Sequence, residues 1–198
     1  MIRIAITGNI ASGKSTVQKI LADLSYAVLD TDEIGHEVLI KFKDELIKLF
    51  NDSDITNTDG SISRTKLASV VFKDKELKNK LEKFSHPIIR EEIIKFFENN
   101  SEKDLCFVGI PLLFEAHMED LFDKIILVYT NDEIREKRLI LRNNYTPEQA
   151  RNRMACQMPQ DKKKELADYI IENNTNPEEL NEKVKMLLSI FSERNKTV

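Results

Sequence analysis

The sequence predicts an α/β fold built on a five-stranded, parallel, doubly wound sheet, and three observations support this prediction. Short apolar runs rich in β-branched residues alternate with segments of helical periodicity. Strands separated by helices imply parallel pairing with right-handed crossovers. A glycine-bearing motif joins the first apolar run to the first helical segment. The predicted strands are residues 2–7, 26–30, 105–111, 124–129 and 168–172.

The remaining segments have the periodicity of helices, beginning at residues 17–24. About 75 residues separate the second strand from the third, which is too many for one crossover. We therefore expect a helical insertion there, interrupted by turn-forming residues at 51–63. Thr146 and Gln149 predict a capping box at the start of a later helix. A last helix begins at Pro177 and has one apolar stripe, formed by Leu180, Val184, Leu187, Leu188 and Phe191.

These patterns divide the chain into three expected parts. The core comprises residues 1–32, 103–137 and 165–198. The helical insertion comprises residues 33–102, and a small helical lid comprises residues 138–164.

Composition excludes several protein classes. The chain has 198 residues, of which 41% are hydrophobic and 32% charged, so it is neither disordered nor fibrous. No apolar run approaches the length of a membrane helix, and no membrane association is expected. Cys106 and Cys156 are too few for a disulfide framework or a zinc site, so a cytoplasmic location is expected. Without a long exposed apolar seam, a monomer is expected.

The net charge is −4, but the charge is unevenly distributed, and residues 135–164 form one basic segment. A mildly acidic protein with one such segment is more typical of proteins that bind a small anion than of those that bind a nucleic acid backbone. We therefore expect small-molecule substrates and no nucleic acid.

Residues 8–15, GNIASGKS, match the pattern GxxxxGKS between a predicted strand and a predicted helix. Backbone N–H groups of such a loop converge on phosphate oxygens at the helix N-terminus. Lys14 would place its charge on the β and γ phosphates of ATP, and the hydroxyl of Ser15 would bind Mg²⁺. The alternative is a tight glycine turn without a ligand, but it leaves unexplained why two of only five glycines lie here.

This P-loop motif does not by itself distinguish a kinase from a switch GTPase or an ATP-driven motor. The guanine-reading N/T-K-x-D run is missing, because residues 129–132 read YTND. A motor-type ATPase would be longer and would show an apolar run ending in an acidic pair. The remaining class is the small-molecule P-loop kinase, which closes a basic lid over the triphosphate.

The lid prediction depends on arginines at helical spacing. Arg135, Arg138 and Arg142 share one helix face, where Arg138 and Arg142 would stabilise the transferred phosphoryl group. For Arg135 and for Arg153 an ordinary solvated position is an equal alternative. Residues 162–164, three lysines, are interpreted as surface charge.

Two carboxylates follow the second predicted strand, at the sheet edge that faces the ligand in such folds. Asp32 is the better candidate for a base that accepts the proton of an acceptor hydroxyl, and Asp30 the weaker one. The alternative is that Thr31 or Asp32 caps a helix beginning near Glu33.

Five segments of the chain resemble, in order, the motifs of dephospho-CoA kinases. They are GNIASGKST at 8–16, DTD at 30–32, SHP at 85–87, PLLFE at 111–115 and ADYIIEN at 167–173. The resemblance implies a P-loop core with a helical CoA-binding region at residues 33–102 and a lid. It also implies phosphorylation of the ribose 3′-hydroxyl of dephospho-CoA by Mg-ATP, the last step of CoA biosynthesis.

The resemblance also implies roles for individual residues. Asp32 matches the base on the 3′-hydroxyl, Arg138 and Arg142 match lid arginines, and Asn173 lies in the loop beside adenine. Arg64 and His86 fall in the acceptor region, although His86-Pro87 alone would more often be a packed histidine at a helix start. The residues matched to the ATP phosphates are Gly8, Ala11, Ser12, Gly13, Lys14, Ser15 and Thr16.

The chain departs from the family pattern in its loop and on its third strand. Asn9 and Ala11 replace glycines, and Asn tolerates a left-handed backbone better than Ala. Gly109 stands where many members have an aspartate, which leaves Ser15 and Asp32 as the expected metal and base positions. Two other functions stay open: a kinase for another small acceptor, and a nucleotide-dependent binding module without turnover.

Overall fold

The structure is a computed structural model that describes residues 1–51 and 54–194, with side chains to residue 191. Residues 52 and 53 of the predicted 51–63 loop lie outside the described residues. The chain divides into two compact units, one of Met1–Asp30 with Phe97–Val198 and one of Thr31–Phe96.

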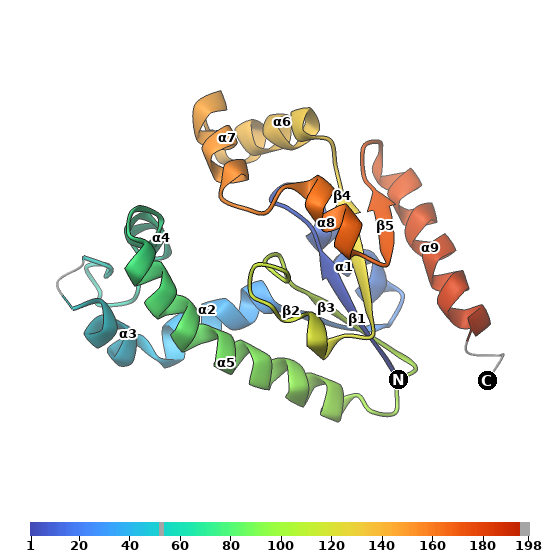
Figure 1. The fold of residues 1–198 in the computed structure, drawn as a ribbon, viewed down its shortest axis with the longest axis horizontal. Helices are drawn as coiled ribbons and strands as arrows, with labels where there is room; N and C mark the ends of the chain where they lie inside the picture. The colour runs from blue at the N-terminus through green and yellow to red at the C-terminus, as the bar shows by residue number, and fades with distance from the viewer. Residues whose placement is uncertain (52–53, 195–198) are drawn as a thin grey trace. The chain divides into compact units, whose positions relative to one another are not determined.

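The first unit is built on one parallel sheet, as predicted (Figure 1). The order of its five strands is β2-β3-β1-β4-β5. The sheet is therefore doubly wound, with strands added on both sides of β1. Three bounds differ from the prediction, because β2 begins at Ala27, β5 begins at Tyr169, and β3 ends at Gly109. Since Pro111 has no N–H for the ladder, the strand cannot continue through it. The strands are β1 Ile2–Thr7, β2 Ala27–Asp30, β3 Leu105–Gly109, β4 Lys124–Tyr129 and β5 Tyr169–Glu172.

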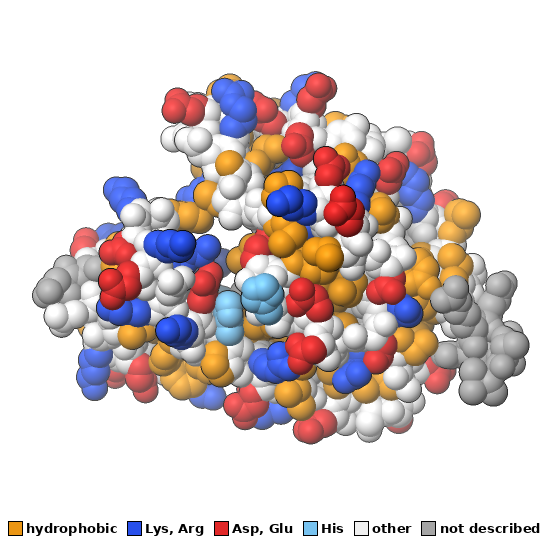
Figure 2. Space-filling view, viewed as in Figure 1, with side chains coloured by type: hydrophobic (Ala, Val, Ile, Leu, Met, Phe, Trp, Pro, Cys, Tyr) orange, Lys and Arg blue, Asp and Glu red, His pale blue; other side chains and the backbone are white. Residues whose placement is uncertain are grey.

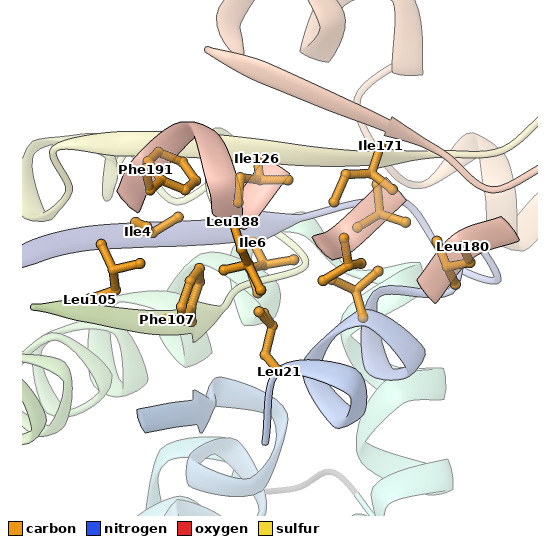
Figure 3. Close-up of a cluster of buried hydrophobic side chains, with 13 residues drawn as sticks. Ile4, Ile6, Leu21, Leu105, Phe107, Ile126, Ile171, Leu180, Leu188 and Phe191 are labelled. Carbon is orange, nitrogen blue, oxygen red and sulfur yellow. The ribbon is translucent and has the colours of Figure 1, made fainter. Parts of the chain in front are cut away.

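The main core lies between this sheet and two helices, α1 (Lys14–Asp23) and α9 (Pro177–Arg194). Alternate residues of β1, such as Ile4 and Ile6, point to this side (Figure 3). The predicted α9 stripe meets them, since all its members are buried or partly buried in the cluster. At roughly 1.5–3 kcal/mol for each large apolar side chain, this cluster is the main stabilising feature of the unit.

Three helices follow β4 and include residues 138–164, the predicted lid, whose expected start lies inside the first of them. They are α6 (Asp132–Asn143), α7 (Pro147–Ala155) and α8 (Gln160–Leu166). The predicted capping box is confirmed: Gln149 N donates to Thr146 Oγ1 at 3.2 Å and Thr146 N donates to Gln149 Oε1 at 2.9 Å. The sequence analysis did not predict α8 or the 3₁₀ turn η1 (Glu119–Leu121).

The second unit is helical among its described residues, apart from one antiparallel bridge between Thr56 and Ile62. Its small core contains Leu46, Phe50, Ile55 and Leu67. Its helices are α2 Thr31–Lys41, α3 Lys43–Phe50, α4 Arg64–Lys73 and α5 Lys75–Asn99, of which the last three residues belong to the first unit.

Two predicted helix starts in this unit are wrong. Helix α2 begins at Thr31 rather than near Glu33, so Asp32 is inside its first turn and is not its cap. His86-Pro87 lies in the interior of α5 and does not begin a helix. A proline lacks one helix hydrogen bond donor, and the surrounding turns of this 25-residue helix accommodate that loss.

On the face drawn in Figure 2, Lys and Arg side chains are interspersed with Asp and Glu among the described residues. Within the part of the chain that the structure describes, no helix is long and apolar enough to cross a membrane.

Candidate active site

The P-loop connects β1 to α1 and is shaped by two glycines. Gly13 has a φ of 96°, and a Cβ there would collide with the carboxamide of Asn173. A Cβ on Gly8 would lie 2.7 Å from the carbonyl oxygen of Val128 and 2.5 Å from Ser12 Oγ. Both positions therefore require glycine, because of the space and, at Gly13, also because of the backbone conformation.

The two residues that replace family glycines have different roles in the loop. Ala11, not Asn9, has the left-handed backbone, with a φ of 63°. Such a conformation costs an L-residue about 1–2 kcal/mol, so Ala11 is a strained position in the loop. Asn9 instead fixes the loop through its side chain, because its Nδ2 donates to the carbonyl oxygen of Met158 at 2.9 Å.

Lys14 is the first residue of α1 and is only 8% exposed. Its Nζ donates to Gln18 Oε1 at 2.9 Å and lies 3.3 Å from Asp30 Oδ1. Asp30, the last residue of β2, therefore pairs with the P-loop lysine.

Ser15 and Thr16 follow in the first turn of α1, and both are exposed. Among the described residues, no group of three or more His, Cys, Asp or Glu could hold a metal ion. Mg²⁺ commonly takes one or two protein oxygens and completes its octahedron with phosphates and water. The exposed hydroxyl of Ser15 at a phosphate-binding helix start fits that kind of site.

Two arginines of α6 hold the carbonyl groups of the P-loop. Arg135 Nε donates to the carbonyl oxygen of Ile10 at 3.0 Å, and its Nη1 lies 2.7 Å from Asp132 Oδ1. Arg138 Nη1 donates to the carbonyl oxygen of Ala11 at 3.2 Å, and its Nη2 to that of Asn173 at 3.1 Å. The solvated alternative for Arg135 is thus wrong, since its side chain is 2% exposed. Burial lowers the pKa of both guanidinium groups, which nevertheless stay charged.

Asn173, predicted in the loop after β5, lies against the P-loop. Its Nδ2 donates to the carbonyl oxygen of Ser12 at 2.8 Å, and its own carbonyl oxygen accepts from Thr130 Oγ1 at 3.0 Å. Thr130 Oγ1 also bonds Ser12 O at 2.9 Å. The end of β4 and the end of β5 are thus joined through the loop.

Four other predicted site residues lie on the helices α6, α2, α4 and α5. Arg142 is exposed near the end of α6, where its Nε donates to Asn143 Oδ1 at 2.9 Å. Asp32, also exposed, is in the second unit, in the first turn of α2. Arg64 is exposed as the first residue of α4, after the cap Ser63, and His86 is half-buried within α5. Burial lowers the pKa of His86, against the opposing effect of Glu82.

A buried ion pair connects the segment before η1 to α8. Lys163 is 0% exposed, and its Nζ lies 3.0 Å from Glu115 Oε1 and 3.1 Å from the carbonyl oxygen of Pro111. The same carboxylate oxygen accepts from Met158 N at 2.9 Å. Burial lowers the pKa of Lys163, and Glu115 opposes that shift. The interpretation of Lys163 as surface charge is therefore wrong.

The connection between α7 and α8 contacts the P-loop. Ile10 N donates to Gln157 Oε1 at 2.7 Å, which adds to the bond from Asn9 to Met158. A cavity of about 520 Å³ opens beside it. Its lining residues are Asn9, Tyr129, Asp132, Arg135, Arg151, Met154, Ala155, Gln157, Pro159, Gln160 and Asp161.

Sequence reasoning missed the roles of Gln18, Gln157 and Lys163 in this arrangement. Only Gln18 had a local signal, because it lies four residues after Lys14 and hence on the same helix face. The others depend on partners far away in the sequence.

Comparison with known proteins agrees with this geometry. The family model described as dephospho-CoA kinase matches residues 2–179. A dephospho-CoA kinase of Listeria monocytogenes is 37% identical over 195 residues, which cover 95% of this chain and 96% of that protein. The fold is that of P-loop kinases.

Two solved structures are also similar. A crystal structure of a Thermus thermophilus protein has a TM-score of 0.82 and 35% identity, with 95% of this chain and 96% of that chain covered. The dephospho-CoA kinase of Campylobacter jejuni has a TM-score of 0.74 and 31% identity, with 98% of both chains covered. With a family model matched over most of its length and relatives above 30% identity across nearly the whole chain, the protein belongs to the dephospho-CoA kinase family.

Proposed function

We propose that this protein transfers the γ-phosphoryl group of ATP to the ribose 3′-hydroxyl of dephospho-CoA, giving CoA and ADP as the last step of CoA biosynthesis. The observation that supports this most is the P-loop at the start of α1, with Lys14 at its end, in a chain of this family. Phosphoryl transfer requires positioning and charge stabilisation more than covalent chemistry, and the loop offers both.

The nucleotide side of the reaction uses the P-loop. Backbone N–H groups of the loop bind the phosphates at the positive end of α1, except those of Ser12 and Thr16, which donate to carbonyl oxygens within the loop. Lys14 leaves its contact with Asp30 to stabilise charge on the β and γ phosphates. Ser15 would hold Mg²⁺, which would neutralise part of the phosphate charge.

Arginines of α6 add to the charge stabilisation. Arg138 donates hydrogen bonds to the carbonyl oxygens of Ala11, in the P-loop, and of Asn173, in the loop after β5. Arg142 is on the exposed part of the same helix and acts on the transferring group from the lid, residues 138–164. Asn173 contributes to the nucleotide site from the loop after β5.

The acceptor side uses the helical unit. Asp32 takes the proton of the 3′-hydroxyl as general base, and its exposure leaves the carboxylate accessible to a substrate. Arg64 is exposed at the start of α4, where a cation suits the phosphate groups of dephospho-CoA. His86 contacts the same acceptor from α5, so residues 33–102 form the acceptor-binding region.

We also propose that the protein is a cytoplasmic monomer that acts on small molecules, with neither nucleic acid nor membrane as a partner. The scattered mixture of charges in Figure 2 suits that proposal better than a continuous basic surface would.

The first test is ADP release from Mg-ATP with dephospho-CoA, beside CMP, UMP, AMP and shikimate as acceptors, with the product mass checked for the added phosphate. Selective turnover with dephospho-CoA supports the proposal. Turnover with another acceptor would support the assignment as a kinase and reject dephospho-CoA as its substrate. ATP binding without turnover on any acceptor favours a nucleotide-dependent binding module.

Variants then test the roles of individual residues. Asp32→Asn should lower kcat by orders of magnitude with ATP affinity retained, whereas Glu33→Gln, an exposed acid in the same turn, should leave it unchanged. Arg142→Ala should slow transfer, with Lys137→Ala as the matched exposed control on α6. Unaltered turnover in Asp32→Asn would remove the base assignment.

A further inference from the structure

Gln18 and Gly109 form a contact that the proposed chemistry does not yet use. Gln18 is on α1, one turn after Lys14, and it is 6% exposed. A buried carboxamide is normally hydrogen bonded, since leaving it unpaired is destabilising. Here its Oε1 accepts from Lys14 Nζ at 2.9 Å, so a neutral group holds the ammonium of the P-loop lysine.

Gly109 provides the space for that carboxamide. It ends β3, where it pairs with Ile6 of β1 on one side and Asp30 of β2 on the other. A Cβ at this position would lie 2.5 Å from Gln18 Cδ and 2.8 Å from Gln18 Oε1, well inside contact distance. Gly109 has no positive φ, so a side chain there would conflict with the observed position of the Gln18 carboxamide and not with the backbone conformation.

Gln18 and Asp30 affect the charge of Lys14 in different ways. An ammonium has three N–H donors, and a carboxamide oxygen accepts one of them without cancelling the positive charge. The carboxylate of Asp30, in contrast, neutralises part of that charge, so a phosphate must compete with Asp30 for the ammonium. A carboxylate at residue 18 would add a second negative competitor, whereas an apolar side chain would leave the ammonium without this orienting bond.

We propose that Gln18 is a positioning residue for Lys14, and that Gly109 is needed because it leaves room for the Gln18 carboxamide. Together, Gln18 and Gly109 orient the Lys14 ammonium toward the β and γ phosphates without neutralising its charge. This inference rests on the proposed nucleotide site, but not on the identity of the acceptor.

The test measures nucleotide affinity by calorimetry without acceptor, so it is independent of turnover on dephospho-CoA. Gln18→Met keeps the volume and removes the acceptor atom. It should weaken ATP binding about tenfold and leave AMP binding within twofold, because Lys14 serves only the β and γ phosphates. A merely structural role of Gln18 would weaken both nucleotides alike. Gln18→Glu should weaken ATP binding as well, and more strongly than AMP binding.

A double-mutant cycle tests the role of Gly109. Gly109→Ala displaces the carboxamide and should weaken ATP binding about as much as Gln18→Ala does. The double variant Gln18→Ala/Gly109→Ala should be no weaker than Gln18→Ala alone, since the new Cβ then meets empty space.

Two results would overturn the proposal: wild-type ATP affinity in Gln18→Met, or losses that multiply in the double variant. Thermal unfolding of each variant confirms that the protein is folded. If wild-type protein binds ATP but does not phosphorylate dephospho-CoA, the proposed function fails and these affinities still decide the role of Gln18.

Discussion

We expect substitutions of the two partners in the Glu115–Lys163 ion pair to lower the stability of the protein by unequal amounts. In Glu115→Gln the ammonium of Lys163 stays in a fully buried position and loses its counter-charge. At 3.0 Å the attraction is about 5 kcal/mol for an effective dielectric constant of 20. Because the Glu115 side chain is 24% exposed, water screens part of this, and we expect a loss of about 3 kcal/mol.

The converse substitution, Lys163→Met, removes the buried charge itself. The carboxylate of Glu115 is left partly hydrated and still accepts from Met158 N. We expect it to cost about 1–2 kcal/mol, mainly because the carbonyl oxygen of Pro111 loses its 3.1 Å bond from Lys163 and keeps the longer one, 3.4 Å, from Thr7 Oγ1. Glu115→Gln should therefore be the more damaging of the two.

Urea unfolding at pH 7 measures both, with exposed Glu165→Gln on α8 as the matched control. In thermal unfolding, 3 kcal/mol corresponds to a Tm lower by roughly 6–12 °C for a chain of this size.

The pH dependence of this stability loss has a defined sign. Because the folded pKa of Lys163 is below its unfolded value, the unfolded state binds more protons between the two, and stability rises with pH there. The deficit of Glu115→Gln should hence be smaller at pH 9.5 than at pH 7. Equal costs for the two substitutions, or a Glu115→Gln cost below about 1 kcal/mol, would refute this reasoning.

Three further substitutions test separate local features. Ala11→Gly should stabilise the protein to urea by about 0.5–1 kcal/mol, because relief of the left-handed strain exceeds the added unfolded-state entropy; a loss of stability would contradict that strain. Asp123→Asn should cost up to about 1 kcal/mol above pH 4, since its half-exposed carboxylate pairs with Arg3. Arg3 holds the pKa of Asp123 below its usual range, so this contribution is lost as pH falls through the folded pKa. Unfolding curves of variant and wild type should converge in acid, and a constant difference would exclude the ion pair as its source. Thr146→Ala should cost about 1 kcal/mol in urea unfolding through the lost cap, and no change would mean that α7 does not need it.

Features encoded by neighbouring residues were predictable from the sequence. The P-loop is one contiguous motif between a strand and a helix, and the capping box needs only residues 146 and 149. Periodicity likewise placed every strand within two residues of its observed ends. Boundaries failed where a single backbone group decides, as at Gly109, where β3 ends before the proline.

Residues whose role depends on distant partners were not predictable. Nothing near Lys163 distinguishes it from the lysines on either side of it, yet its partners Glu115 and Pro111 are about 50 residues away. The left-handed conformation belongs to Ala11 although Asn9 tolerates it better, because the path of the loop and not residue preference sets the angle. Such assignments require the packed structure.

The three arginines of α6 show how a shared helix face can hold side chains with different roles. Arg135 is buried on the carbonyl oxygen of Ile10, Arg138 is partly buried on that of Ala11, and Arg142 is exposed. Seven residues along a helix span about 10 Å, so the face leads away from the P-loop as it passes from the first arginine to the last. Arg138→Ala should therefore disturb the loop and weaken ATP binding, whereas Arg142→Ala should leave ATP affinity intact and lower only the rate of transfer. Parallel titrations and rate measurements on both variants distinguish these effects, and equal ATP affinities would show that Arg138 does not support the loop.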